Sequence, residues 1–479
     1  MVDIPSLING QWVESETTRS VRDFEGAERV RIHGTSPTGI RVAKRAMLQI
    51  REQLASTPSG VLLRIVKRAA KDYLGASERE LIARLSGSPI SYVNASVETY
   101  RHWMSHIDQY LEQAFGTAEY ERVPIRVHGK QVGYRKHLPT GPVVAVLPAN
   151  EDGAAAYVLA QLFLSKNPIL VKPSSRGASA FATERFIRAL HAAILAEAPD
   201  RKYLLQAVQM ANVLDTPDKA AQVAELGVEN CSFVIFGSDA SVEEITKAIT
   251  YRTRKIIKMG TGFSVSVILD DADLGNALNE IYESITEDRG NKCTSTHVLY
   301  VQEGVYAQVM AELDKLAGIP HAANPLDASA RTARLDAATQ DAVNRRIGEL
   351  YPAHGLQRQD FRVYELDENA HVEELPGAIV FVKKITSPEH FCRLLANDSS
   401  SNGIERNLVT SVYTSDERKV DAIAARVPSH IIKWNISSNA INFFIEHQSV
   451  FLIREVMQST VVETLHAQKA HEPLQEVRA

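Results

Sequence analysis

Cysteine is scarce in this chain, which has 479 residues and only three cysteines: Cys231, Cys293 and Cys392. An odd number of widely separated cysteines argues against a disulfide framework and is typical of proteins in a reducing cytosol. The sequence also has no C-x-x-C pair and no histidine cluster with metal-ligand spacing. We therefore expect no metal site.

The chain also lacks a large net charge and long apolar runs. The net charge of −5 and the pI near 6.3 give no reason to expect nucleic acid or an anionic membrane as a partner. Every apolar run is too short to span a membrane, and the first residues lack the pattern of a signal peptide. We expect a soluble cytoplasmic protein with about two to four domains.

The first third of the chain predicts a hairpin, several helices and a ribbon. Residues 7–15 read as a hairpin that turns at Asn9-Gly10, and apolar residues recur at helical spacing over 42–53, 61–73 and 78–85. A longer helix is expected over 91–115. Its Tyr, Trp and Met residues are interpreted as packing core, because such a stripe at this spacing is more often core than a cofactor box.

An alternation of apolar and polar residues over 119–138 predicts an extended ribbon. After it, strands and helices alternate. Apolar runs at 141–148 and 168–171 are typical of buried parallel strands, and helical segments at 154–163 and 178–197 follow them. Further strands are expected at 232–236, 256–257, 265–269, 298–301, 379–382 and 409–413. This pattern predicts a doubly wound α/β fold.

Cys293 is the first candidate for chemistry. It lies in a bend rich in Gly, Ser and Thr, between a helical run and a strand. A thiolate attacks carbonyl groups well, and Lys292 or Arg289 would favour the thiolate. The alternative from the residues alone is a structural cysteine.

A second candidate is the junction at Gly237-Ser238, where a strand gives way to a helix. Ser241 and Glu244 have the spacing of a capping box for that helix. A helix N-terminus suits a pyrophosphate, although most capped helices bind nothing and no G-x-G-x-x-G motif accompanies this one.

Eight short motifs occur along the chain in the order of one enzyme family. The first four are Ile8 to Val13 (compare "INGxWV"), Pro142 to Asn150 ("GVV..I.PWN"), Lys172 to Ser175 ("KPSE") and Phe236 to Ser238 ("FTGS"). The others are Gly260 to Leu274 ("GGKSPxIVxxDADL"), Gly290 to Cys293 ("GQxC"), Glu373 to Gly377 ("EEIFGP") and Trp434-Asn435 ("VWVN"). Over most of its length the chain resembles the aldehyde dehydrogenase superfamily.

The resemblance implies roles for individual residues. Cys293 would be the nucleophile, and Asn150 with the backbone N–H of Cys293 would form the oxyanion hole. Such donors stabilise the transition state by roughly 3–4 kcal/mol. The remaining positions would bind a nicotinamide nucleotide: Lys172 at the adenosine ribose, Gly237 and Ser238 at the pyrophosphate, and Glu374 at the nicotinamide ribose. Ser174, Ser175, Arg176 and Gly260 would belong to the same cofactor site. From the residues alone, Asn150 could equally be a turn residue and Glu374 a solvated loop charge.

The sequence departs from the family at the general base. Hydrolytic members carry a glutamate at the head of "ELGGK", and the corresponding residue is Met259. Loss of a general base typically slows a reaction by roughly 10²–10⁴-fold. Glu283 or Glu287 could take over. If neither glutamate acts as the base, the chain resembles the acylating branch of the superfamily. That branch includes fatty acyl-CoA reductases and uses coenzyme A as co-substrate.

Two further departures concern the cofactor and the substrate. Ser175 and Arg176 replace a glutamate that would repel a 2′-phosphate, which favours NADP(H) over NAD(H). The late "PFGGxKxSG" motif is absent, and the apolar segment in its place, residues 442–453, favours a hydrophobic acyl or aromatic substrate.

The fold expected from the resemblance has two doubly wound α/β domains plus a small β oligomerisation element. We place a Rossmann-like nucleotide-binding domain at 1–118 and 139–255, a catalytic cysteine domain at 256–439, and an oligomerisation element, for a homodimer or homotetramer, at 119–138 and 440–479. The predicted function is NAD(P)H-dependent reduction of an acyl thioester to the aldehyde, or the reverse. The alternatives are a hydrolytic aldehyde dehydrogenase and a silent nucleotide-binding scaffold.

Overall fold

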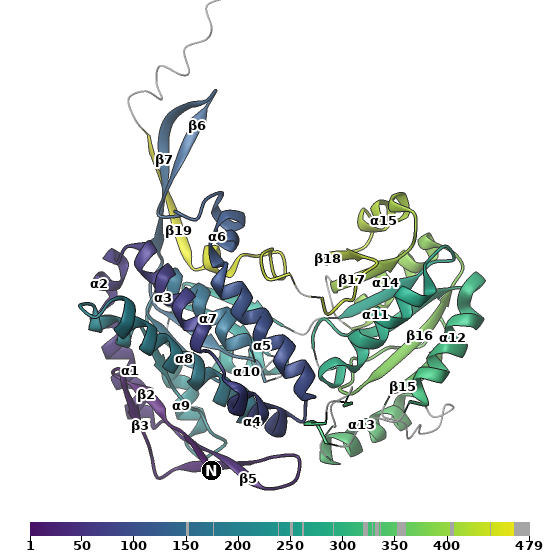
Figure 1. Cartoon of the computed structure of the whole chain (residues 1–479), viewed down its shortest axis with the longest axis horizontal. Helices are drawn as coiled ribbons and strands as arrows, with labels where there is room; N and C mark the ends of the chain where they lie inside the picture. Colours follow the sequence, from purple (N-terminus) through teal and green to yellow (C-terminus); the bar gives the residue numbers. More distant parts are fainter. Residues whose placement is uncertain are drawn as a thin grey trace, which may run out of the picture.

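The computed structural model describes residues 1–149, 153–175, 177–237, 239–249, 252–260, 263–290, 292–319, 324–327, 329–330, 335, 337–351, 361–402, 407–440 and 442–463. Its elements form two α/β lobes and a ribbon that projects from the first lobe (Figure 1). Three predicted site residues, Asn150, Arg176 and Ser238, lie outside the described residues.

A seven-stranded sheet forms the centre of the first lobe. In spatial order its strands are β12 (Lys255–Met259), β11 (Ser232–Phe236), β8 (Val143–Val146), β9 (Ile169–Lys172), β10 (Val208–Met210), β2 (Ser6–Ile8) and β3 (Gln11–Val13). The first five are parallel. The chain runs outward from β8 through β9 and β10 and then returns to β11 on the other side of β8. The strand order therefore reverses between β8 and β11.

The predicted hairpin is confirmed. Strands β2 and β3 pair antiparallel, and the turn residues Asn9 and Gly10 have φ angles of 53° and 74°. Two residues with positive φ give the type of turn whose twist matches paired strands, and Asn followed by Gly adopts it at low cost.

Successive side chains of the central strand β8 enter different cores. Val143 and Ala145 pack with one set of helices, and Val144 and Val146 with another, as the two-residue period of a strand requires. The first set includes α3 (Ser59–Asp72), α5 (Ile90–Ser105), α7 (Ala154–Leu164) and α8 (Gly177–Glu197), and the second α1 (Pro37–Gln49), α9 (Lys219–Leu226) and α10 (Asp239–Ala248). Burying one such valine contributes about 1.5–3 kcal/mol.

Shorter elements complete this lobe. They are α2 (Arg51–Ser56), α4 (Ala76–Ser86), α6 (Ile107–Phe115), α16 (Leu452–Glu455), the 3₁₀ turn η1 (Lys202–Gln206), and a small sheet of β1 (Val2–Ile4), β5 (Glu28–His33) and β4 (Thr18–Arg22).

The second lobe contains a six-stranded parallel sheet. Its spatial order is β15 (Arg362–Leu366), β16 (Ile379–Ile385), β14 (Thr296–Gln302), β13 (Ser264–Ile268), β17 (Asn407–Tyr413) and β18 (Ser429–Trp434). One core contains residues of α11 (Leu274–Thr286) and α12 (Glu303–Ala317), and the other residues of α13 (Ala337–Leu350), α14 (Pro388–Ser401) and α15 (Glu417–Ala424). The turn η2 (Glu287–Gly290) follows α11.

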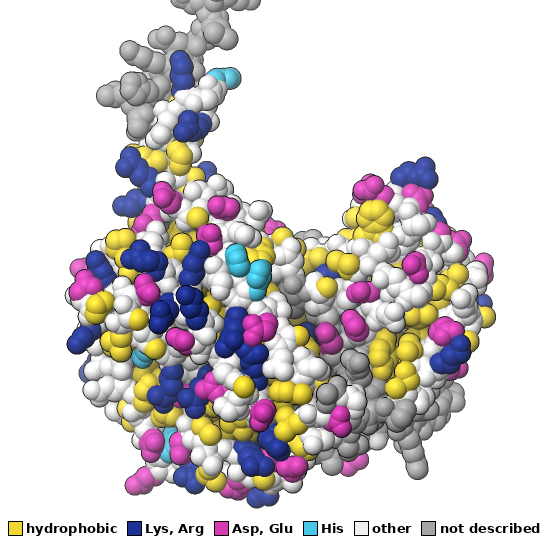
Figure 2. Space-filling view, viewed as in Figure 1, with side chains coloured by type: hydrophobic (Ala, Val, Ile, Leu, Met, Phe, Trp, Pro, Cys, Tyr) yellow, Lys and Arg dark blue, Asp and Glu magenta, His cyan; other side chains and the backbone are white. Residues whose placement is uncertain are grey.

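The projecting ribbon has three strands, β6 (Arg122–Val127), β7 (Lys130–Pro139) and β19 (Met457–Glu463). Strands β6 and β7 form the predicted ribbon, and β19 adds antiparallel to β7 from Met457↔Pro139 to Glu463↔Gly133. In the space-filling view a notch separates the ribbon from the second lobe (Figure 2). The C-terminal strand thus joins the segment with which it was grouped from the sequence.

Several expectations need correction. The single helix expected over 91–115 is two helices, α5 and α6, which meet at His106. Helix α10 begins at Asp239, so Ser241 lies inside it and the predicted capping box is wrong.

The domain division stays a prediction, but the sheets bear on its boundaries. Strand β12 pairs with β11 along its whole length, so a boundary at residue 256 would cut the first sheet. A boundary after Met259 fits both sheets. Residues 451–457, grouped with the oligomerisation element, contribute to the core of the first lobe.

Membrane crossing was not expected. Among the residues that the structure describes, no helix combines the length and the apolar character needed to cross a membrane.

Candidate active site

A cavity of about 490 Å³ lies where the two lobes meet. The carboxyl ends of β8, β9, β11 and β12 contribute to its wall, together with α7, α9, α10 and the segment before β14. It therefore includes the point where the strand order of the first sheet reverses. Open α/β sheets bind ligands at this position, because the connections on the two sides diverge there and leave a crevice.

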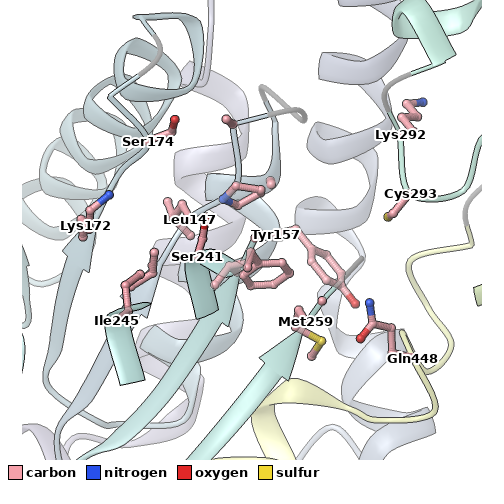
Figure 3. A pocket seen from close by; sticks show the side chains of 18 of the residues that line it. Leu147, Tyr157, Lys172, Ser174, Ser241, Ile245, Met259, Lys292, Cys293 and Gln448 are labelled. Carbon is pink, nitrogen blue, oxygen red and sulfur yellow. The ribbon is translucent and has the colours of Figure 1, made fainter. Parts of the chain in front are cut away.

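The cavity brings together the predicted site residues that the structure describes. They come from both lobes: Lys172, Ser174, Ser175, Gly237, Gly260, Cys293 and Glu374. In Figure 3, Lys172 and Ser174 lie toward one end, and Cys293, Met259 and Gln448 toward the other. Two of the residues expected to bind the nucleotide, Lys172 and Ser174, thus lie at one end, and the thiol lies at the other. The individual roles remain predictions.

Hydrogen bonds to the second lobe hold Cys293 in place. The Ser264 hydroxyl donates to the backbone oxygen of Cys293 at 2.8 Å, which fixes the bend to the start of β13. The next residue, Thr294, donates its hydroxyl to Asn439 Oδ1 at 2.7 Å. Cys293 itself is half-buried and forms no disulfide. A short bend fixed on both sides presents the thiol to the cavity.

Lys292, expected to favour the thiolate, is buried beside Cys293. Its ammonium group lies 3.5 Å from Glu287 Oε2 and 4.6 Å from the centre of the Tyr92 ring. In Figure 3 its side chain turns away from the thiol. The carboxylate of Glu287 and the face of the Tyr92 ring therefore both stabilise the positive charge of Lys292. The side chain of Arg289 lies outside the described residues.

The nucleotide end of the cavity carries two lysines. Burial, with the nearby charge of Lys219, lowers the pKa of Lys172. A hydrogen bond to Asp215 raises the pKa of Lys219, which lies 3.0 Å from that carboxylate and 3.7 Å from Glu244. Ser175 lines the same end. Sequence reasoning missed Lys219, because it follows a loop that matches none of the quoted motifs.

Met259 occupies the end of β12 and is 4% exposed. Its backbone oxygen accepts from Gly237 N at 3.3 Å, which ties the ends of β11 and β12 together. Among the described lining residues only Glu244 and Glu374 are carboxylic acids, and neither Glu283 nor Glu287 is among them. The structure does not support the two carboxylates that the sequence offered as replacement bases.

Glu374 has a basic neighbour. Its Oε1 lies 3.4 Å from Nε2 of His297, a buried residue on β14. The predicted nucleotide-binding carboxylate therefore contacts a strand of the second sheet, only four residues beyond Cys293 in the chain. Sequence reasoning did not single out His297.

Aromatic rings form the wall at the thiol end. Phe443 lies 4.9 Å from Tyr100 and 5.0 Å from Tyr157, measured between ring centres. Gly153, at the start of α7, makes room for this cluster, because a Cβ there would lie 1.9 Å from Tyr100 Cε2. The aromatic stripe of 91–115 is core as predicted, since Tyr100 and Trp103 are buried, and Tyr100 also reaches the cavity.

His447 and Gln448 complete this end. Burial, with the nearby charge of His430, lowers the pKa of His447 to about 4, so its imidazole is neutral at physiological pH. Both residues come from the segment that replaces "PFGGxKxSG". No motif marked them, and their approach to Cys293 depends on the tertiary fold.

Metal chemistry was not expected. In the part of the chain that the structure describes, no group of three or more His, Cys, Asp or Glu side chains could hold a metal ion.

Comparison with known proteins identifies the family. Residues 12–352 match the model of the "Aldehyde dehydrogenase family". Among curated proteins, "Aldehyde dehydrogenase family 7 member A1" of Malus domestica is 24% identical over 41% of this chain and 39% of its own length. The acylating sulfoacetaldehyde dehydrogenase of Bilophila wadsworthia is 26% identical over 39% of this chain and 38% of its own.

Solved structures match along nearly the whole chain. Glyceraldehyde-3-phosphate dehydrogenase of Methanocaldococcus jannaschii, solved in complex with NADP, superposes with a TM-score of 0.77 at 17% identity, covering 94% of this chain and 99% of that one. The matches to the first curated relatives are shorter and span 39% and 37% of those proteins. The expected aldehyde dehydrogenase fold is confirmed, and the chain belongs to the aldehyde dehydrogenase family.

Proposed function

We propose that this protein catalyses NAD(P)H-dependent reduction of an acyl thioester to the aldehyde, or the reverse acylating oxidation. The observation that carries this proposal is Met259, which lines the cavity. By the resemblance in sequence, it stands where hydrolytic members carry their glutamate. A thioether accepts no proton, so water is poorly activated against an acyl group on Cys293. A thiol attacks as a thiolate and needs less help from a base.

Cys293 carries the covalent step. Its thiolate attacks the carbonyl carbon of the acyl thioester, the carbon–sulfur bond to coenzyme A breaks, and the departing thiol takes up a proton. The acyl group is then held on Cys293 through a new thioester bond. Reduction of that carbonyl by one hydride and one proton releases the aldehyde and restores the thiol. In the reverse direction the same steps oxidise an aldehyde and need a thiol acceptor.

The described residues fit a nicotinamide nucleotide. Lys172, Lys219 and the first turns of α10 face one end of the cavity, where phosphate groups need positive charge and backbone N–H donors. Such a nucleotide, when bound, supplies the hydride. Ser175 in place of a carboxylate, with two lysines close by, favours NADP(H), the form bound in the Methanocaldococcus jannaschii structure.

The cavity wall suits a hydrophobic acyl group. Tyr100, Tyr157 and Phe443 are apolar over most of their surface, and Met259 adds a flexible thioether. An aromatic or branched acyl chain would bury its surface against these rings. We therefore expect benzoyl-like and medium-chain thioesters to react faster than acetyl thioesters.

The alternative function is hydrolytic oxidation of an aldehyde to the acid. One observation favours it: His447 presents a neutral imidazole at the thiol end, where an attacking water would have to lie. A group with a pKa of about 4 is a weak base, however, so this route would be slow.

Absorbance of NADPH tests both functions. Purified protein is mixed with NADPH and a panel of acyl-CoA thioesters, and each aldehyde is then tested with NADP⁺, with and without coenzyme A. We expect NADPH consumption on thioesters and aldehyde oxidation that requires the thiol. Cys293→Ala should abolish turnover, whereas Cys392→Ala, a half-buried thiol on α14, should retain it. Rapid formation of free acid without any thiol would contradict the proposal.

The projecting ribbon is proposed to mediate self-association. Its outer strand β19 carries Val461, an apolar side chain that is 50% exposed. A sheet edge with exposed apolar residues is a common surface for pairing between copies of one chain.

A further inference from the structure

A second cavity lies at the opposite edge of the first sheet. It has a volume of about 550 Å³ and is bounded by the end of α1, the start of α2, and the segments that precede β8, β11 and β12. The candidate active site includes the carboxyl ends of those strands, whereas this cavity includes their amino ends. The two cavities share no lining residue.

Five cationic side chains from three parts of the chain line this second cavity: Arg41, Lys44, Arg45, Arg51 and Arg254. Among the described lining residues, Glu229 alone is acidic. The chain as a whole has a net charge of −5, whereas the lining of this cavity is strongly positive. Cations that surround a concave surface raise the local concentration of anions.

Part of this charge is compensated within the protein. Arg41 lies 2.7 Å and Lys44 3.1 Å from the two carboxylate oxygens of Glu225, and Lys44 also donates to the backbone oxygen of Gly227. These bonds hold α1 against the end of α9. Arg41 and Lys44 are thus structural as well as basic.

The remaining arginines are available to a ligand. Neither Arg45 nor Arg51 has an ion pair or a hydrogen bond to any residue that the structure describes, and both are exposed. Arg254 donates one bond, to Gln458 Oε1 at 3.1 Å, and its guanidinium has further N–H groups.

Arginine and the shape of the cavity indicate the chemistry of the ligand. The planar guanidinium binds phosphate oxygens in pairs, which a lysine cannot do. The cavity is far larger than one phosphate ion, and Leu48, Pro142 and Val228 add an apolar surface to its wall. We propose that it binds an anion with two or more phosphate groups, with room for an attached apolar group such as a nucleobase. The site is distinct from the nucleotide-binding end of the active site.

Binding is tested by isothermal titration with two probes, inorganic pyrophosphate and ADP, at constant ionic strength. The protein is titrated without NADPH, because NADPH itself carries three phosphate groups and a nucleobase and would compete for this cavity. Variants of the lining arginines separate binding here from binding at the active site. Saturable binding of both probes with similar affinity would indicate that the phosphates suffice, and tighter binding of ADP that the apolar wall contributes. Absence of saturable binding by either probe would overturn the proposal.

Matched variants show where the probes bind. Arg45→Gln and Arg51→Gln each remove one charge without breaking an interaction that the structure describes, and each should weaken binding by about tenfold. Arg393→Gln on α14, an exposed arginine in the other lobe, removes the same charge and should leave the affinity unchanged. Equal affinity in all three variants would place the probes elsewhere and overturn the proposal. Turnover measured alongside confirms that each variant is folded.

Discussion

If the proposed thiol-dependent function holds, installing a carboxylate at position 259 should add a hydrolytic activity that needs no thiol. Met259 lines the same cavity as Cys293, and Figure 3 shows both side chains at one end. Glutamate is nearly as long as methionine, so Met259→Glu would place an acid where a water must be activated. We expect aldehyde oxidation without added thiol to rise by roughly 10²–10⁴-fold, the usual contribution of a general base.

Burial at this position helps the new residue in one respect and costs stability in another. Met259 is only 4% exposed, so a carboxylate there would be desolvated and its pKa raised toward neutrality, where a general base is most effective. Replacing a buried apolar side chain with a polar one should cost about 1–3 kcal/mol of unfolding free energy. We expect a lower melting temperature together with a gain of activity.

The assay compares Met259→Glu with Met259→Gln, which has the same size but accepts no proton at neutral pH. NADPH formation from an aldehyde and NADP⁺ is followed without coenzyme A, and free acid is quantified as the product. The glutamate variant alone should gain activity. If both variants behave alike, or if the wild-type enzyme already releases acid at a comparable rate, then position 259 does not control the attack of water.

Three further predictions concern other parts of the chain. Lys219→Met should raise the KM for NADPH by about tenfold and change the KM for NADH little, because only NADPH has a 2′-phosphate to pair with this lysine. Equal changes in the two KM values would contradict this assignment. Burial lowers the pKa of His191 to about 4, so between pH 7 and pH 5 the unfolded chain takes up a proton that the folded one does not, and the unfolding free energy should fall by about 2 kcal/mol. In urea titrations His191→Gln should lose less over that range than the wild-type protein. Val461→Glu on the ribbon should shift light scattering toward smaller assemblies, and Thr460→Ser, an exposed position on the same strand, should not.

Much of the fold could be predicted because many of its strands are buried on both faces. The sequence of such a strand is an unbroken apolar run. Strands β8, β9 and β11 were found in this way. The missed strands lack that signal. Strand β10 has only three residues, and it is held by its pairing with β9 rather than by its own pattern. The break between α5 and α6 has neither Pro nor Gly to mark it.

The residues of the candidate site could be predicted only where a short stretch of sequence around them has a recognisable motif. Lys172 ends a buried strand, Gly237 follows another, and Cys293 lies in a distinctive bend, so local sequence pointed to all three. Lys219 and His447 reach the cavity from segments with no such signature. They lie 74 residues before and 154 residues after Cys293 in the chain, and only the tertiary fold brings all three to one cavity.

The two lobes divide the chemistry between them. The second lobe fixes the proposed nucleophile, through the hydrogen bond from Ser264 to the Cys293 backbone, whereas the first lobe supplies residue 259 from the end of β12. A change at position 259 therefore leaves the anchoring of the thiol untouched. Apart from its effects on stability and on the cavity wall, it alters what can attack the acyl group afterwards. The choice between water and a thiol acceptor is thus separable from the fold and from the first covalent step, which is why one substitution should be enough to change it.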